Sequence, residues 1–384
     1  MKKTGNLTSM ASFLTALLMI ALIAFPLSSC ASGNENQPAV TRLDDDGYLY
    51  YMDYTKDYYG PDVIDAMRKI GFIDHGCSVF VTHNTEGELI TCRNYDAMHR
   101  VSEEDPTITG LNIVIHCKPE GKYESIAVGD AVWCGEDNPL LQRNGPDKEG
   151  FTPDLLDILP YECSDGINEK GLCVSAQRVD IKEGDQPAGF PAGSTMLLRY
   201  MLDDCANVDE AVRKTETGIL EPADWQDCHF LVSDATGRSV VIESRNGRVT
   251  VVPSDLCTNF YLGSDDMEDS YRGDNLWEEA VKITDEENTS DFHYGYGHGY
   301  HRFAVIQAMM KCYRNPTTVM PESTALVILR SVAQNPYTNA VGVSMTQYSV
   351  IYNNEKKTAE IWPFQNYSKS YKFDVEGNRI PTDR

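Results

Sequence analysis

Short apolar runs separated by turn residues dominate the sequence, and longer amphipathic stretches lie between them. Runs bounded by Asn, Asp and Gly predict strands at 78–83, 88–93, 229–233, 239–243, 248–252, 347–352 and 358–362. Apolar residues at helical spacing predict helices at 61–70, 194–203, 302–312 and 322–333, and a further helix beginning after Asn207. Strand and helix runs that do not alternate strictly are typical of an α+β fold, in which helices pack outside antiparallel sheets.

Residues 1–30 predict an export signal. Lys2 and Lys3 precede an apolar run over 11–26, and small residues then lead to Cys30. This pattern resembles the lipobox of bacterial lipoproteins, so we expect residues 1–29 to be removed and Cys30 to carry a lipid. An ordinary signal peptide with an incidental Cys is the alternative. The protein is therefore expected to be exported and anchored to a membrane of a bacterial cell envelope.

Two stretches follow the signal. Residues 31–46 are polar and predict a flexible tether. Residues 47–60 are rich in Tyr, and we expect these aromatic side chains to pack against a domain. The amphipathic helix at 61–70 begins with Pro61 and ends before Gly71, as short helices commonly do.

Composition excludes several classes of function. A net charge of −25 repels phosphate backbones, so we expect no nucleic-acid partner. The 11 Cys include no C-x-x-C pair, and His293, His298 and His301 fit no zinc signature. No nicotinamide or phosphate motif appears either, so we expect no metal and no cofactor. Most of the Cys are expected to be buried hydrophobic side chains rather than disulfide partners.

One predicted hairpin brings reactive side chains together. A four-residue turn over 84–87 would pair Cys77 with Asn94, and Arg93 and Asp96 would then lie beside the thiol. A slip of one residue changes which of these side chains faces Cys77. Ion pairs on exposed hairpins are common, so the hairpin alone also fits a purely structural role.

The residue types nevertheless suit nucleophilic catalysis. A free thiol with a pKa near 8.5 is only about 3% thiolate at pH 7, and a neighbouring Arg raises that fraction. A carboxylate can orient an ammonium group or the Arg. If the chain is cut before Cys77, its own α-amino group, with a pKa of about 7.7–8.0, can take the thiol proton.

The residues from Gly76 to Val81 and from Arg93 to Asp96 resemble the start of the choloylglycine hydrolase (linear amide C–N hydrolase) family of N-terminal nucleophile (Ntn) hydrolases. Further motifs follow in the family's order: Asp165–Leu172, His229–Asp234, Val240–Glu243, Thr258–Phe260, Tyr300–Phe303 and Thr346–Ser349. The resemblance runs from residue 77 to the C-terminus. It implies a four-layer αββα sandwich of two antiparallel sheets in residues 77–384, preceded by a tether and propeptide over 30–76.

The resemblance also implies roles for five residues. Cys77 would be the nucleophile, Arg93 and Asp96 its charged neighbours, Asn259 an oxyanion-hole donor and Arg302 a conformational support. The Cys77 thiolate would attack the carbonyl of a small-molecule amide, the amine would leave, and water would hydrolyse the thioester. One well-placed oxyanion donor is worth about 3–4 kcal/mol.

Three features depart from the family pattern. Ala97 replaces an aromatic residue, and Arg178 lies where bile-salt hydrolases have Asn and penicillin V acylases Tyr, so Arg178 is a candidate substrate-binding residue. The long segment between Cys30 and Cys77 implies autocatalytic cleavage before Cys77. Two other functions stay open: an acyltransferase that uses the same thioester, and a non-catalytic solute-binding lipoprotein. A homo-oligomer is compatible with either.

Overall fold

The computed structural model describes residues 38–44, 49–60, 75–99, 111–131, 156–179, 194–217, 228–245, 248–263, 299–313, 319–334, 337–338 and 343–382. These residues belong to one compact unit that spans 37–384. The predicted signal sequence, Cys30 and the predicted helix at 61–70 lie outside the described residues.

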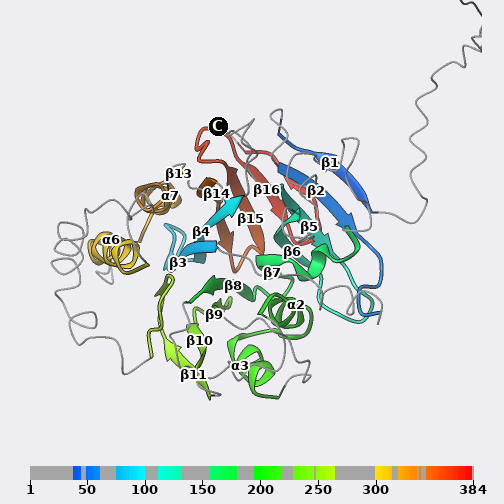
Figure 1. The fold of residues 1–384 in the computed structure, drawn as a ribbon, viewed down its shortest axis with the longest axis horizontal. Helices are drawn as coiled ribbons and strands as arrows, with labels where there is room; N and C mark the ends of the chain where they lie inside the picture. The colour runs from blue at the N-terminus through cyan, green and yellow to red at the C-terminus, as the bar shows by residue number, and fades with distance from the viewer. Residues whose placement is uncertain are drawn as a thin grey trace, which may run out of the picture. The chain divides into compact units, whose positions relative to one another are not determined.

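Two sheets form the centre of this unit (Figure 1). In the described part of the chain, sheet A has nine strands in the order β1 (Ala39–Arg42), β2 (Leu49–Tyr54), β5 (Asn112–Cys117), β6 (Ser125–Asp130), β7 (Cys163–Asn168), β8 (Cys173–Arg178), β9 (Cys228–Ser233), β10 (Ser239–Arg245) and β11 (Arg248–Pro253). Sheet B runs in the order β12 (Leu256–Cys257), β3 (His75–His83), β4 (Leu89–His99), β14 (Val343–Asn353), β15 (Thr358–Pro363), β16 (Tyr371–Asp374) and β17 (Arg379–Ile380), and β13 (Tyr337–Thr338) pairs with β14. Each strand predicted from the sequence is present.

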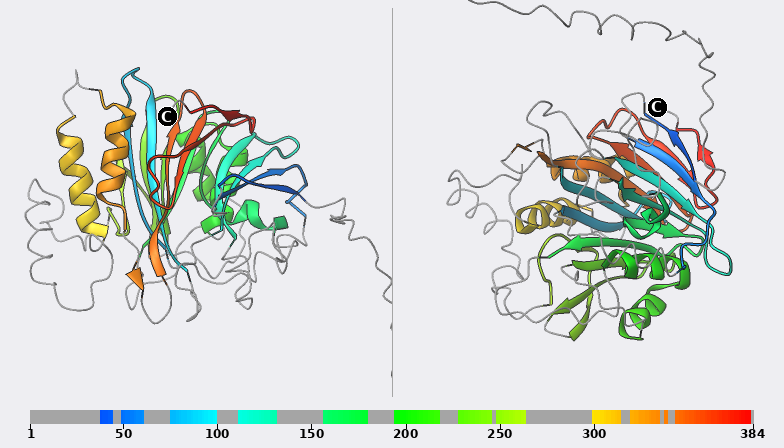
Figure 2. Two further views of the ribbon diagram at one scale, coloured as in Figure 1. Left: turned by 90° about the horizontal axis from the view of Figure 1, so that it is seen from above. Right: turned by 45° about the vertical axis from the view of Figure 1, so that its right-hand side comes forward.

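Helices cover the outer faces of both sheets. Helices α2 (Ser194–Asp204) and α3 (Val208–Thr217), with the 3-10 turn η3 (Leu159–Tyr161), share a hydrophobic core with sheet A. Helices α6 (Gly299–Lys311) and α7 (Glu322–Ser331) share another core with sheet B. A third core, which includes Val114 of sheet A and Val350 of sheet B, lies between the sheets. The predicted αββα sandwich is therefore confirmed (Figure 2, left).

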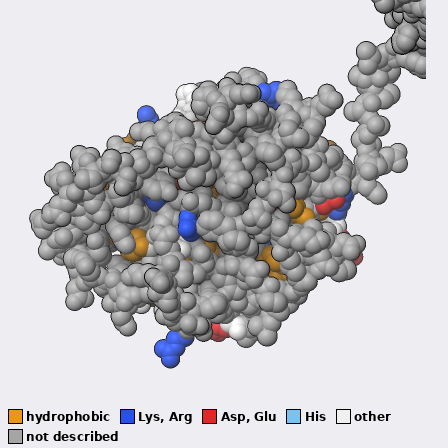
Figure 3. All heavy atoms as spheres, in the orientation of Figure 1, with side chains coloured by type: hydrophobic (Ala, Val, Ile, Leu, Met, Phe, Trp, Pro, Cys, Tyr) orange, Lys and Arg blue, Asp and Glu red, His pale blue; other side chains and the backbone are white. Residues whose placement is uncertain are grey.

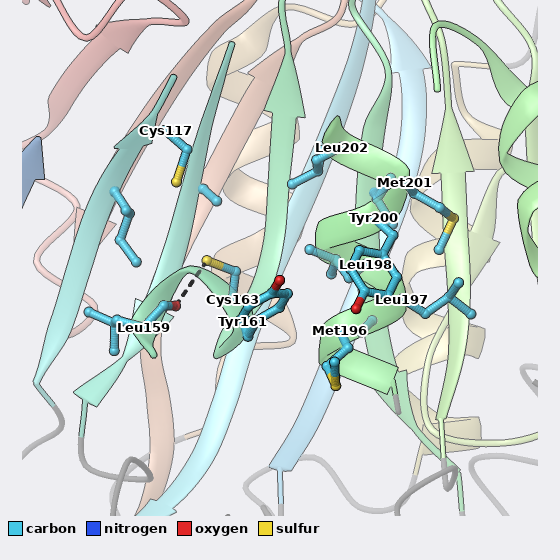
Figure 4. Packing of buried hydrophobic residues seen from close by; sticks show 14 of the residues in the cluster. Cys117, Leu159, Tyr161, Cys163, Met196, Leu197, Leu198, Tyr200, Met201 and Leu202 are labelled. Atoms are coloured by element: carbon cyan, nitrogen blue, oxygen red, sulfur yellow. Dashed lines mark hydrogen bonds between the residues drawn. The ribbon is translucent and has the colours of Figure 1, made fainter. Parts of the chain in front are cut away.

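Packing of α2 shows how these layers form. Its buried side chains Leu198, Met201 and Leu202 lie against sheet A and η3 (Figure 4). Gly166 of β7 allows this approach, since a Cβ there would lie 2.8 Å from the Leu202 side chain and from the Ala127 side chain. The helix therefore packs closely on the strands that lie nearest to the centre of sheet A.

The N-terminal segment is part of sheet A, which differs from the sequence-based expectation. Strand β1 lies within 31–46, so the prediction of a flexible tether is wrong for 39–42. Strand β2 pairs with β5 in parallel, whereas the other strand pairs of the described residues are antiparallel. Alternation of buried and exposed side chains explains β2, because Tyr50, Met52 and Tyr54 point into the core beneath α2. The predicted packing of the Tyr-rich stretch is confirmed.

The β3–β4 hairpin differs from the predicted register by one residue. Cys77 pairs with Tyr95 and not with Asn94. Side chains alternate along a strand, so Arg93 shares the face of Cys77, whereas Asp96 lies on the opposite face. The prediction that both charged residues flank the thiol is therefore wrong for Asp96.

The turn of this hairpin explains the shift. The Asn84 N–H donates to the Glu88 carbonyl over 2.9 Å, which closes a loop one residue longer than predicted. Asn84 Oδ1 accepts the N–H groups of Glu86 and Glu88, each over 2.9 Å. Asn side chains that bind nearby backbone in this way compete with the strand ladder and extend turns.

Cysteine usage agrees with the expectation from the sequence. Of the Cys residues that the structure describes, all are free thiols, and Cys312 alone is exposed. No helix of the described ranges is long and apolar enough to span a membrane. On the face shown in Figure 3, charged and apolar side chains of described residues are scattered and do not gather in one patch.

Candidate active site

Cys77 lies near the start of β3, with its side chain in the core between the two sheets. The residue is fully buried, and burial raises the pKa of its thiol to about 11 despite the opposing effect of Arg93. In this uncut chain the nitrogen of Cys77 is an amide joined to Gly76. The thiol is therefore protonated at neutral pH, and a base is needed to activate it.

Arg93 of β4 crosses from sheet B to sheet A. Its Nη2 donates to Cys77 Sγ over 2.9 Å, and its Nη1 donates to Ser175 Oγ of β8 over 2.8 Å and to the Ser164 carbonyl of β7. Asp165 forms a buried ion pair with Arg93 over 3.0 Å. Burial alone would lower the pKa of Arg93, but Cys77 and Asp165 raise it, so a full positive charge lies beside the thiol.

Two tyrosines complete this network. Tyr348 Oη donates to Asp165 Oδ2 over 2.6 Å, and Tyr352 Oη donates to Asp165 Oδ1. The Tyr348 ring also stacks on Tyr95, the strand partner of Cys77. Burial raises the pKa of Asp165, whereas Arg93 and the two Tyr hydroxyls favour its charged form. Such donors are what a buried carboxylate needs.

Asp96 lies on the other face of sheet B. Its Oδ1 accepts a hydrogen bond from Thr346 Oγ1 over 2.5 Å, and its Oδ2 lies 3.3 Å from Arg302 Nη1 of α6. Burial raises the pKa of this carboxyl to about 6, although Arg302 and Thr346 favour the charged form. Asp96 thus contacts Arg302, which in turn binds the backbone carbonyl of Cys77.

Arg302 binds the backbone of Cys77 from α6. Its Nη1 donates to the Cys77 carbonyl over 2.6 Å and to Ser78 Oγ over 2.7 Å. Its Nη2 donates to Asn259 Oδ1 over 2.6 Å. One guanidinium therefore connects the first residues of β3 with the loop after β12.

Asn259 lies against the bond that would be cut. Its Oδ1 accepts the Cys77 backbone N–H over 2.8 Å, and its Nδ2 donates to the carbonyl of Arg178 over 2.8 Å. Arg178 ends β8 and is half-buried. Gly299 lies close beside this loop, since a Cβ there would lie 2.8 Å from the Asn259 backbone nitrogen.

The structure thus connects Cys77, Arg93, Asp96, Asn259 and Arg302 through direct contacts, with Arg178 beside Asn259. Sequence reasoning assigned no role to Asp165 or to the two Tyr residues that bind it. The sequence carried little signal for them, because the strand Cys163–Asn168 is largely polar in composition and its complete burial appears only in the structure. The described residues contain no group of His, Cys, Asp and Glu side chains that could hold a metal ion.

The arrangement suits attack on a carbonyl. A thiol next to a fixed guanidinium gains thiolate character once a base is present, and Asn259 supplies an amide group within hydrogen-bonding distance of the Cys77 nitrogen. Arg302 and Asp96 restrict the position of that nitrogen. Groups fixed in advance by a buried network lose little freedom in a transition state.

Comparison with known proteins adds a family assignment. Residues 157–359 match the family described as acyl-coenzyme A:6-aminopenicillanic acid acyl-transferase. No curated protein is found to be similar by sequence.

Several solved structures are similar in fold. Two variants of conjugated bile acid hydrolase from Clostridium perfringens share 16% and 15% identity, each with 80% of this chain and 97% of that chain covered, at TM-scores of 0.46 and 0.48. Penicillin V acylase from Agrobacterium tumefaciens shares 17% identity over 79% of this chain and 93% of its own, at a TM-score of 0.45.

Proposed function

The chain belongs to the acyl-coenzyme A:6-aminopenicillanic acid acyl-transferase family of enzymes, and we propose that it breaks a linear amide bond through a thioester on Cys77. The observation that carries the proposal is the contact of Arg93 Nη2 with Cys77 Sγ at 2.9 Å, in a fully buried site whose backbone is bound by Asn259 and Arg302. The family match and the αββα layers are consistent with this chemistry.

The first proposed step is self-cleavage before Cys77. The Cys77 sulfur attacks the Gly76 carbonyl carbon, the thiol proton passes to the Cys77 nitrogen, and the C–N bond breaks so that this nitrogen leaves as an amine. Water then hydrolyses the Gly76 thioester and releases the thiol. A Gly at this position is supported by the packing, because a Cβ on Gly76 would lie 3.1 Å from Gln334 Nε2 and 3.6 Å from Arg302 Nη2.

The second proposed step is catalysis by the new N-terminus. The α-amino group of Cys77, with an ordinary pKa of about 7.7–8.0, takes the thiol proton. The thiolate adds to the substrate carbonyl, and Asn259 with backbone N–H groups stabilises the oxyanion. The amine departs with the proton from the Cys77 ammonium, and water hydrolyses the acyl thioester.

A second candidate, acyl transfer, is favoured by the description of the matched family. The thioester would be the same, and an amine would replace water as the acceptor. Product analysis separates the two. Incubation of enzyme and N-acyl substrate with an added amine gives a new amide in acyl transfer and the free acid in hydrolysis.

Arg178 provides a proposal for specificity. Its backbone carbonyl accepts a hydrogen bond from Asn259 Nδ2 and its side chain is half-buried. If its guanidinium faces the substrate, it would pair with an anionic or strongly polar group of an N-acyl amino acid or N-acyl amine. We therefore expect low activity on glycocholate and penicillin V, and a substrate preference that Arg178→Asn shifts. Equal kcat/KM values for wild type and Arg178→Asn on each substrate would contradict this role. Arg238→Asn, at an exposed site, is the matched control.

We propose that the enzyme is exported and anchored to a membrane of a bacterial cell envelope. Cys30 would carry the lipid, and cleavage before Cys77 would separate that anchor from the catalytic chain. Retention would then depend on non-covalent contacts of the propeptide. Strands β1 and β2 in sheet A, with Tyr54 and Tyr58 buried beneath α2, support such retention.

Intact-mass analysis together with a panel of N-acyl substrates tests the central proposal. Wild type should yield a chain that begins at Cys77 and should cleave at least one amide. Cys77→Ala should remain uncut and lose at least about 10³-fold in kcat/KM. Cys312→Ala, which changes the exposed thiol, should behave as wild type. An uncut wild type without amide turnover would support a binding protein, and turnover by Cys77→Ala would exclude the assigned nucleophile.

A further inference from the structure

A second buried polar cluster lies behind the loop that carries Asn259. His229 of β9 is fully buried and contacts two other strands or loops. Its Nδ1 lies 3.1 Å from Glu243 Oε1 of β10, and its Nε2 lies 2.6 Å from the Thr258 carbonyl oxygen. The reaction outlined above uses none of these groups.

The partners of His229 determine its protonation state. A carbonyl oxygen only accepts hydrogen bonds, so Nε2 carries a proton. Glu243 also accepts the N–H of Leu262 at Oε1 over 2.6 Å and the N–H of Gly263 at Oε2 over 2.8 Å. Burial would raise the pKa of Glu243, but His229 and these two amides lower it, so Glu243 is a carboxylate and Nδ1 of His229 is a donor too. Both ring nitrogens carry protons, and His229 is an imidazolium.

The groups around His229 agree with this charge. Burial would lower the pKa of His229, whereas the Glu243 carboxylate, through its charge and its hydrogen bond, raises it. The neighbouring strand β8 contributes the uncharged Gln177, and the Tyr261 ring lies edge-on at 6.5 Å. No other charged group contacts the ring among the described residues.

Cys257, His229 and Glu243 have the order of a catalytic triad, but Cys257 is not placed for attack. Its Sγ lies 3.3 Å from His229 Nε2 and donates to Gln177 Oε1 over 2.9 Å. Its backbone pairs with Val79 in the sheet, whereas the backbone N–H and carbonyl of Cys77 are bound by the side chains of Asn259 and Arg302. The cluster therefore has a different use from that of Cys77.

That use follows from what the cluster binds. His229 binds the carbonyl at the start of the segment 258–263, and Glu243 binds the two amides at its end. Asn259 is the second residue of this segment, and its Oδ1 binds the Cys77 nitrogen. The segment also binds the start of α6, because the hydroxyl of its first residue, Thr258, donates to the Gly299 carbonyl over 2.7 Å.

We propose that His229 is a positioning residue: a permanent imidazolium, fixed by Glu243, that holds the segment 258–263 and thereby sets Asn259 against the Cys77 nitrogen. The inference rests on the proposed function for its effect on turnover. A charged donor is needed because the Thr258 carbonyl and the Glu243 carboxylate are both acceptors. A neutral ring would leave one of them without its hydrogen bond inside the core.

The charge is tested directly by NMR of protein with ¹⁵N-labelled His. At about pH 8, where an ordinary His with a pKa of about 6.5 is neutral, His229 should show two protonated ring nitrogens. Comparison with His229→Gln assigns the resonance of His229. If His229→Gln does not fold, the resonance that shifts in Glu243→Gln is assigned to His229 instead. A neutral ring at this pH overturns the inference.

The consequence is tested by kinetics on the best N-acyl substrate. His229→Gln and Glu243→Gln should each lower kcat by about 10–100-fold and change KM by less than about threefold, since one oriented donor is disturbed. His83→Gln, the same change at an exposed His of β3, should match wild type. A kcat for His229→Gln within about twofold of wild type overturns the inference. Wild type that turns over no amide, with His229 still an imidazolium, contradicts the proposed function instead.

Discussion

Two buried clusters in this chain have nearly the same chemical content and different surroundings. Between the sheets, Arg93 contacts the sulfur of Cys77, pairs with Asp165, and Asp165 accepts two Tyr hydroxyls. Beneath α2, Arg199 lies 3.5 Å from the sulfur of Cys117 and pairs with Asp203 over 2.8 Å, and Asp203 accepts the hydroxyls of Tyr58 and Tyr59. All four charged side chains are fully buried or nearly so.

The difference lies in the backbone around each thiol. Cys77 is near the start of a strand, and Asn259 and Arg302 bind its N–H and its carbonyl. Cys117 ends β5 with its backbone in the sheet ladder on both sides. The same residue types therefore form a candidate site in one place and a structural contact in the other. Reactive side chains do not define a site until the backbone of the nucleophile is bound as well.

The largest expected effect separates the two arginines. Arg93→Met and Arg199→Met each leave a buried Asp without its ion pair, so each should lower the free energy of unfolding by about 3–5 kcal/mol. Only Arg93→Met should also lower kcat/KM of the folded protein, by about 10²-fold, because the thiolate loses its cation. Denaturant titration and kinetics on folded fractions measure both quantities. Arg93→Lys replaces the Met variant if the latter does not fold, and equal kcat/KM losses at the two positions would refute the distinction.

The next prediction concerns the tyrosines. Tyr58 and Tyr59 precede the proposed cleavage point, and their hydroxyls lie 2.8 and 2.6 Å from Asp203 Oδ2. Hydrogen bonds to a charged group contribute about 1.5–3 kcal/mol each, so the double change to Phe should loosen the cut propeptide at least about tenfold. Co-purification of the two chains after a high-salt wash measures this.

Tyr348→Phe is the matched control, since it removes the same kind of bond from Asp165 in the other cluster. It should leave retention of the propeptide unchanged. A wild-type catalytic chain that appears in the soluble fraction while the lipidated fragment stays in the membrane would show that the propeptide releases the enzyme.

A smaller effect concerns pH and Asp96. Its folded pKa of about 6 lies above the ordinary value of 3.8, so the folded chain binds this proton more tightly than the unfolded chain does. The contribution to stability is present below the unfolded pKa and is lost as pH rises to about 6. As pH rises between these two values, the free energy of unfolding of wild type should fall by on the order of 1–3 kcal/mol. That of Asp96→Asn should not show this fall. Calorimetry at both ends of the window measures it, and parallel curves for the two proteins would count against the assigned pKa.

The smallest expected effect concerns Gly76. A Cβ there would lie 3.1 Å from Gln334 Nε2, so Gly76→Ala requires a shift of a few tenths of an ångström next to the bond that we propose is cut. We expect Gly76→Ala to slow self-cleavage by about three- to tenfold. Time courses of the intact mass measure this rate. Gly60→Ala, with open space around the added methyl group, should cleave at the wild-type rate.

The sequence predicted the layers and most of the site, but not its internal geometry. Strand periods located β3, β4, β14 and β15 of sheet B and β9 to β11 of sheet A, but not β5 to β8. The family resemblance supplied the four-layer arrangement and named the residues that contact Cys77. The register of β3 and β4 was missed because the side chain of Asn84 lengthens the turn, which periodicity does not reveal. The role of His229 was missed because a lone His at the start of an apolar strand does not show which backbone carbonyl it will meet.

The N-terminal strands were missed for another reason. Residues 39–42 carry mostly exposed side chains, so their polar composition resembles that of a linker. Their place in sheet A depends on backbone pairing with β2, which composition does not report. The burial of Tyr50, Met52 and Tyr54 did carry a signal, because they recur with a period of two.

The parallel pairing of β2 with β5 has a consequence for handling this protein. If the segment before Cys77 were absent, β5 would become the last strand of sheet A, with six buried residues and an unpaired row of backbone donors and acceptors. Such an apolar sheet edge pairs readily with other chains and aggregates. A catalytic chain expressed alone from residue 77 would therefore precipitate, whereas co-expression of residues 31–76 would keep it in solution.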